Sequence, residues 1–404
     1  MHACTTVNFV DNRPNRPRGL PVVREYGVLS NIEGLGLARL SCRRPLTRRL
    51  AELGGLSFRR VSQLLMRAGA TGFDITSSLD GRSAVAEMLD RYSTLSGQVH
   101  VLSEDDPWRI LWGPDRRAFL PFQERLSTLI AWRDPVGRPE DANEVIRGFR
   151  AYAAAVGKHA VLLGISRAIV EKLPKSSFHS VWLGTELFYE PKTWHIRGDA
   201  GKETRQACNH ARKHGGTARE VHPLQDAGVR KGIEDVTEAW MRARPERRSR
   251  SFLRTAPLEH AQHRRYFIVE GDERIESLLV CSPVSLRGQY LQDLVRRPDA
   301  LRGSNELNIV TAMAVFQREG LSLVTGGIIP FYDPNRPRCA QRPQDGGILG
   351  RAIGRFDHLF RFSGLQQFRA KFIPSRVVDV YALLWPGVLT PGLVRDLSAI
   401  LWRG

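Results

Sequence analysis

The sequence predicts an α/β fold made of two tandem domains of similar size behind a basic N-terminal extension. Three observations lead to this prediction. The chain has 404 residues, which is more than one average domain. Strands followed by a helix and a further strand recur twice in the sequence, an order typical of α/β domains. The first 60 residues contain eleven arginines, no lysine and only four acidic residues.

The basic extension is expected to cover residues 1–80. Within it, apolar side chains recur at helical spacing between Leu50 and Ala68, which predicts a helix there. Residues 81–225 and 226–404 are then the two folded domains.

The first domain is predicted to begin with short strands. Alternating apolar residues between polar turns indicate three of them, at Gln98–Leu102, Trp108–Trp112 and Leu126–Trp132. Helical spacing follows at Asn143–Val156, and a short apolar run predicts a strand at Ala160–Ile165.

A second set of elements has the same order. Helical patterns predict a basic helix at Lys202–Gly215 and another helix at Gly232–Arg242. Three consecutive antiparallel strands are then predicted at Tyr266–Glu270, Ile275–Val284 and Gln289–Val295. A strongly patterned helix at Asn305–Glu319 leads into a strand at Leu321–Thr325. The repeated order suggests an old duplication.

The charge balance indicates a polyanionic partner. Lys and Arg number 60 against 42 Asp and Glu, a net charge of +18. Such a surplus favours nucleic acid, anionic lipid or a phosphorylated substrate. No stretch reaches the roughly 18 apolar residues of a transmembrane helix, and the N-terminus lacks a signal-peptide pattern. We therefore expect a cytoplasmic protein, with peripheral contact at the inner membrane face also compatible with the charge.

Common catalytic and metal-binding patterns are missing from the sequence. It contains no HExxH, no GxSxG and no GxxxxGK[ST]. The five cysteines lie far apart without a CxxC pair, which argues against a disulfide framework and a zinc ribbon. His210 and His214 have metal-ligand spacing, but their neighbours are cationic. We expect a solvated basic face there and no metal site.

Two basic runs fit a phosphate backbone. The first contains Arg205, Arg212 and Lys213, and the second includes Arg247 and Arg248. The planar guanidinium group matches phosphate with a fork of donors, so these residues are candidates for nucleic-acid binding. A solvated surface loop is the alternative for each run taken alone.

The segment after the third predicted strand carries the strongest local signal. It places Asp293 and Arg296 at a strand end, and Arg302-Gly303 directly before a helix that contains Glu306. The helix N-terminus suits an anion. Asp293 could orient a nucleophile or take its proton, while Arg296 or Arg302 could hold a phosphate or a carbonyl oxygen. The alternative is an Asp–Arg surface pair beside a capped helix.

With these residues in view, the chain resembles the C-terminal catalytic domain of aminoacyl-phosphatidylglycerol synthases, also called multiple peptide resistance factors. The matching pieces span roughly residues 85–385 and occur in the family's order. They are Asp134-Pro-Val-Gly137, Leu183-Gly-Thr-Glu-Leu-Phe188, the basic stretch Arg205–Gly215, Val236-Thr-Glu-Ala-Trp240, Asp293-Leu-Val-Arg296, Arg302-Gly303 with Glu306, and Phe362–Phe372 with Pro374.

The resemblance implies two tandem GNAT-like domains and an aminoacyl transfer from charged tRNA to a hydroxyl of phosphatidylglycerol. It also implies that Asp293 and Arg296 belong to the active site and that Lys371 lies close by. An aminoacyl ester is already activated, so positioning, proton removal and oxyanion stabilisation suffice for transfer. We therefore expect no cofactor, with aminoacyl-tRNA as co-substrate.

Two departures from the family bear on the acceptor. An Arg-rich segment of about 80 residues stands where the membrane enzymes carry transmembrane helices. The final piece continues as Ser375-Arg-Val-Val-Asp-Val-Tyr381 in place of the family's Trp and Pro-Arg-Tyr-Leu-like strand. Soluble relatives load an amino acid from tRNA onto a hydroxylamine, as in valanimycin biosynthesis, so a small-molecule acceptor stays open beside an anionic lipid. An acyl-CoA-dependent N-acyltransferase and a non-enzymatic RNA-binding protein are the alternative functions.

Overall fold

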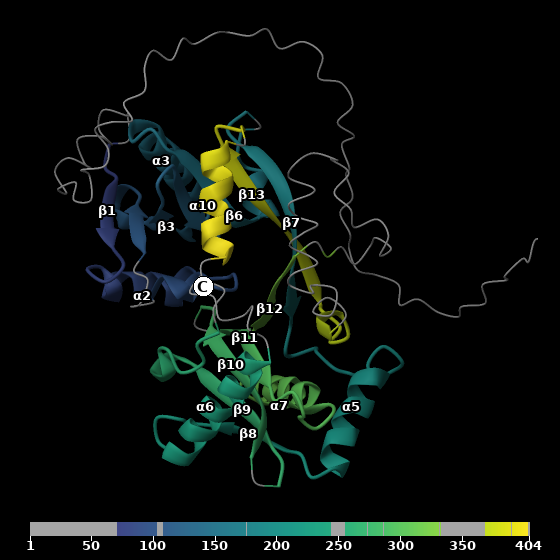
Figure 1. The fold of residues 1–404 in the computed structure, drawn as a ribbon. Helices are drawn as coiled ribbons and strands as arrows, with labels where there is room; N and C mark the ends of the chain where they lie inside the picture. The colour runs from purple at the N-terminus through teal and green to yellow at the C-terminus, as the bar shows by residue number, and fades with distance from the viewer. Residues whose placement is uncertain are drawn as a thin grey trace, which may run out of the picture. The chain divides into compact units, whose positions relative to one another are not determined.

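The strands of the described residues form one continuous sheet, shown in the computed structural model in Figure 1. The structure describes residues 71–102, 108–174, 176–243, 255–272, 274–285, 287–330, 332, 368–388 and 390–402, all within one unit, Leu56–Gly404. The predicted helix at Leu50–Ala68 and the candidate residues Arg247 and Arg248 lie outside these ranges.

Two sets of elements repeat the same connectivity. The first set is β1 (Asp74–Ser77), α2 (Arg82–Tyr92), β2 (Arg109–Trp112), β3 (Ala118–Glu124), β4 (Thr128–Trp132), α3 (Ala142–Ala155) and β6 (His159–Ser166). The second set is β8 (Thr217–Val221), α6 (Ala227–Arg242), β9 (Arg265–Glu270), β10 (Ile275–Pro283), β11 (Gly288–Arg296), α7 (Ser304–Arg318) and β12 (Leu323–Pro330). In each set four strands pair antiparallel in sequence, and a helix then returns the chain to a parallel fifth strand. The predicted repeat of the element order is therefore visible in the topology.

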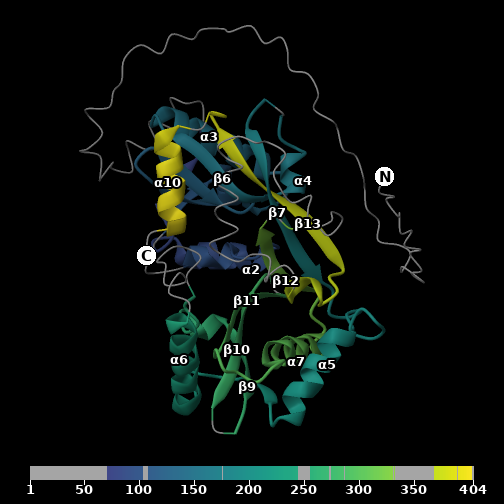
Figure 2. The ribbon, with the colours of Figure 1, turned by 45° about the vertical axis from the view of Figure 1, so that its right-hand side comes forward.

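The two sets exchange one strand each at the middle of the sheet. β7 (His179–Tyr189) follows the first set in sequence but pairs with β12 of the second. β13 (Arg376–Trp385) follows the second set but pairs with β6 of the first, and β7 and β13 pair with each other. The strand order is β1-β2-β3-β4-β6-β13-β7-β12-β11-β10-β9-β8, and the short β5 (Val136–Gly137) pairs with β3. Figure 2 shows the long strands β7 and β13 running side by side between the two sets. The domain boundaries at residues 80 and 225 stay predictions.

Helices cover the sheet of the second set on both faces. Ile233, Val236 and Trp240 of α6 pack in one apolar cluster with Val280 and Val295. On the opposite face, side chains of α7 pack with alternate strand residues in a second cluster that contains Ile309, Met313, Phe316, Leu279 and Leu291. In the first set α3 packs against β3, β4 and β6 through Phe149 and Tyr152. Burial of apolar surface on both faces gives the layered arrangement of a mixed α/β fold, and the predicted α/β class is confirmed.

Most elements of the described chain follow the sequence patterns. The three antiparallel strands β9, β10 and β11 are confirmed, as are α3, α5 (Lys202–Lys213), α6 and α7. The structure also contains short helices η1 (Gln98–Leu102), η2 (Pro114–Arg116), α4 (Arg167–Val170) and η4 (Ala261–His263), and a C-terminal helix α10 (Pro391–Trp402).

The predicted strand at Gln98–Leu102 is wrong, because this segment is the 3-10 helix η1. The side-chain oxygen of Gln98 accepts hydrogen bonds from the backbone N–H groups of Thr94 and Leu95, at 3.0 and 3.1 Å. Such side-chain to backbone bonds compete with strand pairing. The alternation of Val99 and Val101 imitates a strand in a segment whose local hydrogen bonds fold it into a turn.

Candidate active site

The strands β11 and β12 separate near the middle of the second set. They pair in parallel over only three residues, from Gly288 with Leu323 to Tyr290 with Thr325. Beyond Tyr290, β11 continues to Arg296 without β12 as a neighbour, while β12 follows β7 to Pro330. We call the point at Tyr290 and Thr325, where the two strands part, the fork. A parting of neighbouring strands leaves backbone and side-chain groups free to meet a ligand.

Asp293 lies on β11 just past the fork. Its side chain is buried, with the residue 9 % exposed, and its Oδ2 atom has no hydrogen-bond partner among the described residues. Burial raises the pKa of Asp293 to about 6; the Arg264 guanidinium opposes this rise and the Glu259 carboxylate adds to it. A buried carboxyl that titrates near neutral pH is suited to accept a proton from a substrate.

A bulge in β11 places Tyr290 and Asp293 on the same face of the sheet. Cys281 of β10 pairs with Leu291, but the next residue, Val280, pairs with Asp293, so Gln292 is an extra residue. Without the bulge, residues three apart on a strand would face opposite sides. Burial raises the pKa of the Tyr290 phenol, the charge of Asp293 adds to the rise, and Arg369 opposes it.

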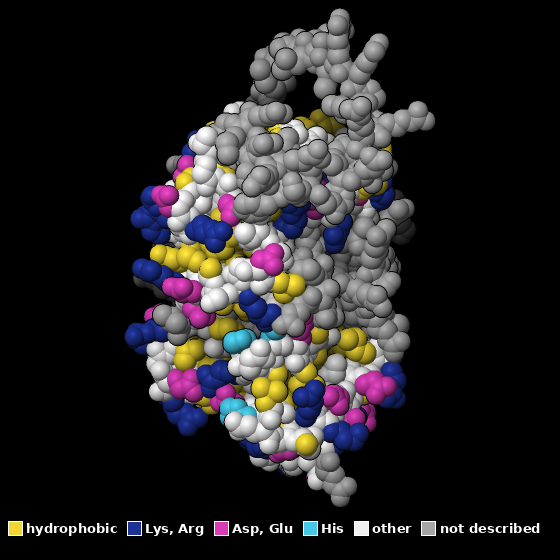
Figure 3. Space-filling view, turned by 90° about the vertical axis from the view of Figure 1, so that its left-hand side faces the viewer, with side chains coloured by type: hydrophobic (Ala, Val, Ile, Leu, Met, Phe, Trp, Pro, Cys, Tyr) yellow, Lys and Arg dark blue, Asp and Glu magenta, His cyan; other side chains and the backbone are white. Residues whose placement is uncertain are grey.

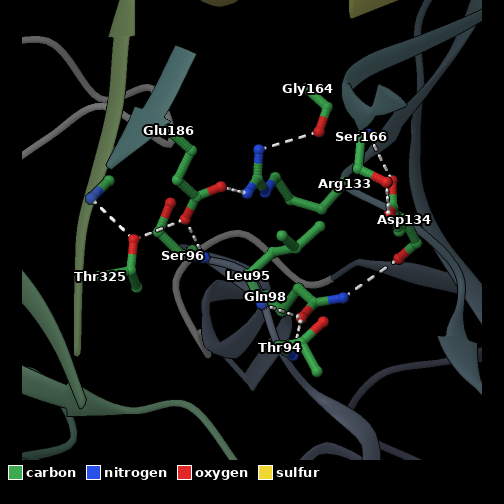
Figure 4. A network of polar contacts seen from close by, with 12 residues as sticks. Thr94, Leu95, Ser96, Gln98, Arg133, Asp134, Gly164, Ser166, Glu186 and Thr325 are labelled. Carbon is green, nitrogen blue, oxygen red and sulfur yellow. Dashed lines mark hydrogen bonds and ion pairs between the residues drawn. The ribbon is translucent and has the colours of Figure 1, made fainter. Parts of the chain in front are cut away.

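A network of buried polar groups borders the fork on the side of the first set (Figure 4). Glu186 of β7 and Arg133, which follows β4, form an ion pair whose side chains are both 0 % exposed. Glu186 Oε1 also accepts from the backbone N–H of Ser96 at 2.8 Å and from Thr325 Oγ1 at 2.7 Å. The adjacent Asp134 accepts from the Ser166 N–H at 2.7 Å. Burial raises the pKa of Asp134, and the bonds from Ser166 oppose the rise. The network joins residues of both sets of elements.

A second cluster of charged groups lies where α5 meets the start of α7. Lys371 Nζ is 2.5 Å from Glu306 Oε1 and lies 4.4 Å from the centre of the Phe368 ring. Gly303 precedes α7 with φ +89°, and a Cβ atom there would come within 2.0 Å of the Ala207 carbonyl oxygen of α5. Close packing of α5 on the Arg302-Gly303 turn therefore requires the glycine.

The structure separates Asp293 from Arg296. From Asp293 to Arg296 the pairing of β11 with β10 is regular, so these two side chains point to opposite faces of the sheet. Asp293 shares its face with Val280 and Val295 on the α6 side, whereas Arg296 is paired with Ser277, whose hydroxyl accepts from Asn308 of α7. Asp293 is buried, so the alternative of an Asp–Arg surface pair does not describe this segment.

The other predicted residues gather around α5 and α7. Lys371 and Glu306 are in direct contact, and the carbonyl of Arg302 lies 3.3 Å from His210 Nδ1. Arg212 and Lys213 form the exposed last turn of α5. Arg205 lies on α5 as well, but its Nη1 donates to the carbonyls of residues 196 and 198 and holds that loop. The cluster is thus distinct in position from Asp293.

Sequence reasoning missed Glu186, Arg133 and Tyr290. Glu186 occurs within the motif Leu183–Phe188, so a signal was present, but a buried ion pair between distant strands cannot be recognised from local pattern. Within the described ranges, no group of three or more His, Cys, Asp or Glu side chains is arranged to hold a metal ion. Among the helices of these same ranges, none has the length and apolar character needed to cross a membrane.

Comparison with known proteins identifies the class and then the family. The mixed α/β fold is shared with two solved structures, the C-terminal domain of a putative lysylphosphatidylglycerol synthetase from Agrobacterium fabrum and L-PGS from Bacillus licheniformis. They superpose with TM-scores of 0.67 and 0.64 at 18% and 16% identity, each covering 80% of this chain and 97% of the other. The family model described as phosphatidylglycerol lysyltransferase, C-terminal, matches residues 108–384. The chain belongs to this family.

Curated relatives are longer than this chain. The lysylphosphatidylglycerol biosynthesis bifunctional protein LysX of Gordonia bronchialis is 25% identical over 344 residues, which is 81% of this chain and 29% of the relative. The phosphatidylglycerol lysyltransferase of Staphylococcus aureus is 19% identical over 72% of this chain and 34% of its own length. The chain therefore corresponds to only part of these proteins.

Proposed function

We propose that the chain is an aminoacyltransferase that moves an aminoacyl group from aminoacyl-tRNA to a hydroxyl, amine or hydroxylamine of an acceptor. Membership of the phosphatidylglycerol lysyltransferase family supports the reaction class. The observation that carries the proposal is Asp293, a buried carboxyl just past the fork of β11 and β12. Its Oδ2 atom has no hydrogen-bond partner in the described chain, and burial raises its pKa to about 6.

Aminoacyl transfer requires that the protein position the two substrates and supply one general base. The acceptor oxygen or nitrogen attacks the carbonyl carbon of the aminoacyl ester, and Asp293 takes the proton of the acceptor. The bond between the carbonyl carbon and the ribose oxygen of the tRNA then breaks. That oxygen leaves as a hydroxyl by taking the proton that Asp293 received, which returns Asp293 to its ionised form. At neutral pH a carboxyl with a pKa of about 6 is mostly ionised, so it is ready to act as the base.

Cations around α5 and α7 suit the phosphates of the donor. Arg212 and Lys213 end α5, and Arg302 lies beside His210 of the same helix. Contacts of this kind position a nucleic acid through its backbone and make binding dependent on salt. On the face shown in Figure 3, by contrast, Lys and Arg side chains are spread among acidic ones. We therefore place the donor at the α5–α7 surface.

The acceptor is proposed to be phosphatidylglycerol or a small hydroxyl- or amine-bearing molecule. Relatives named for lysylphosphatidylglycerol synthesis favour the lipid. A net charge of +18 also favours contact with an anionic bilayer surface. An assay with vesicles that contain or lack phosphatidylglycerol distinguishes these acceptors. Transfer to the lipid requires phosphatidylglycerol in the vesicles, whereas transfer to a small molecule does not.

A transfer assay tests the proposal. The full chain is incubated with a set of radiolabelled aminoacyl-tRNAs and either phosphatidylglycerol vesicles or candidate small acceptors, and label leaving the tRNA is measured. Asp293→Asn should lower the rate by roughly 10² or more. Asp299→Asn is the matched control, because Asp299 lies on the same segment with its side chain exposed and paired with Arg274. Absence of transfer from every charged tRNA, or a normal rate in Asp293→Asn, would refute the assignment.

A further inference from the structure

Glu186 is held in the interior by three polar groups from different parts of the chain. Its Oε2 faces the guanidinium of Arg133, and its Oε1 accepts from the Ser96 N–H and from Thr325 Oγ1. The donors come from the segment after α2, from the end of β4 and from β12. Figure 4 shows the Glu186 carboxylate at the centre of these contacts. One side chain therefore connects the two sets of elements.

Burial and backbone conformation both make the Arg133–Glu186 ion pair energetically costly. Removing two charges from water is costly, and a well-packed apolar pair is often at least as stable. Arg133 also adopts φ +67°, a left-handed conformation that disfavours side chains with a Cβ atom. Its Nη1 donates to the carbonyl of Gly164 at 2.8 Å, which fixes the guanidinium. Strain and buried charge together indicate a role beyond stability.

The hydroxyl of Thr325 links Glu186 to the backbone of β12 at the fork. Its hydroxyl donates to Glu186 and accepts from the Gly327 N–H at 3.0 Å. Between Thr325 and Gly327 the register of β12 against β7 shifts by one residue, so Gly326 is a bulge residue. Thr325 is also the last residue of β12 that pairs with β11. The Thr325 hydroxyl therefore closes the bulge at the residue where β12 leaves β11.

The bulge in turn supports groups beside Asp293. A Cβ atom on Gly327 would come within 2.7 Å of the Tyr290 ring and 3.2 Å of Arg369 Nη1. A shift of the bulge would therefore displace the Tyr290 ring, which lies on the same face of β11 as Asp293. The segment after α2 also contacts the turn between β10 and β11, because the Ser285 N–H donates to Ser93 Oγ at 2.7 Å.

We propose that Glu186 and Thr325 are positioning residues that set where β12 leaves β11 and thereby hold Tyr290 and Asp293 in the geometry needed for transfer. The catalytic consequence rests on the proposed function, whereas the effect on the β12 bulge does not. Thr325 is the residue to test, because loss of either charge of the Arg133–Glu186 pair would leave the other buried and unpaired.

Thr325→Val removes the hydroxyl and retains the shape of the side chain. The Gly327 amide loses its acceptor and should exchange with solvent deuterium at least about tenfold faster. The transfer kcat should fall about ten- to a hundredfold with KM changed less than about twofold, because misplacement of reacting groups affects the chemical step more than binding. Thr325→Ser retains the hydroxyl and should restore both values to within about threefold of the parent.

Thr185→Val is the matched control. Thr185 lies on β7 next to Glu186, is 2 % exposed, and its hydroxyl has no partner in the described part of the chain. This variant should change neither Gly327 exchange nor kcat. Unchanged Gly327 exchange in Thr325→Val, or an equal loss of kcat in Thr185→Val, would overturn the inference. A parent chain without transfer activity would refute the proposed function, and the exchange result would still decide whether Thr325 fixes the bulge.

Discussion

Asp293→Asn should stabilise the fold while it lowers the rate of transfer by roughly 10² or more. Burial raises the pKa of Asp293 from 3.8 to about 6. One pKa unit corresponds to about 1.36 kcal/mol, so the ionised carboxylate destabilises the folded chain by about 3 kcal/mol relative to the protonated form. Asparagine has the same shape without the charge. The variant should therefore be more stable than the parent by up to about 3 kcal/mol near pH 7.5.

The stability difference between Asp293→Asn and the parent chain should depend on pH. A carboxyl whose pKa is raised in the folded state contributes stability that is complete below its unfolded value, about 4, and is lost as the pH rises through about 6. The advantage of Asp293→Asn should therefore be about half as large near pH 5 as near pH 7.5. Transfer by the parent should show the opposite trend and rise with pH to a plateau above about 6, since the base acts when ionised.

Denaturant unfolding followed by tryptophan fluorescence measures the free energy of unfolding of both chains at the two pH values. A variant that is less stable than the parent near pH 7.5 would refute the reasoning, because Asp293 would then make favourable contacts as a carboxylate. Equal differences at both pH values would show that charge is not the cause. If the variant is more stable and its transfer rate is lowered by roughly 10², the Asp293 carboxyl contributes to activity at a cost in stability.

Two further predictions concern the α5–α7 surface. Gly303→Ala should cost about 2–4 kcal/mol of stability, since φ is +89° and the new Cβ meets the Ala207 carbonyl; Gly320→Ala, with φ +72° and open space, should cost about 1 kcal/mol. Chemical denaturation of both variants compares them, and similar losses would show that α5 does not confine the turn. Replacing Arg212 and Lys213 together by Gln should weaken tRNA binding and reduce the log–log salt slope by about one to two. Filter binding over a series of salt concentrations measures the slope, and an unchanged slope would place the tRNA elsewhere.

Local patterns predicted the repeated elements of the described chain well. The helix α7 and the strands β9, β10 and β11 follow periodicities of 3.6 and 2, because each buries one face or stripe against a neighbour. The predicted strand at Leu321–Thr325 ends too early, since β12 continues to Pro330 through the bulge at Gly326. Two consecutive glycines usually indicate a turn. Here they permit close approach of Tyr189 and Tyr290 to the backbone.

Pairing between distant strands could not be predicted in the same way. The exchange of β7 and β13 between the two sets of elements depends on contacts about 200 residues apart in the chain, for which local periodicity carries no information. The same holds for Glu186, whose partners Ser96 and Thr325 lie on segments that meet only in the folded chain. The role of a buried acidic residue becomes clear from the groups that contact it, and the folded topology determines which groups those are.

The Asp-x-x-Arg motif places its two side chains on opposite faces of one strand. On a regular strand, residues three apart face opposite sides of the sheet, and β11 is regular from Asp293 to Arg296. The two side chains therefore cannot act side by side on one atom, and a reaction that uses both must assign them different tasks. Asp293 is buried beside Tyr290, whereas Arg296 is exposed on the face covered by α7, whose first turn contains Glu306. Under the proposed function, we therefore assign proton transfer to Asp293 and contact with the polyanionic donor to Arg296.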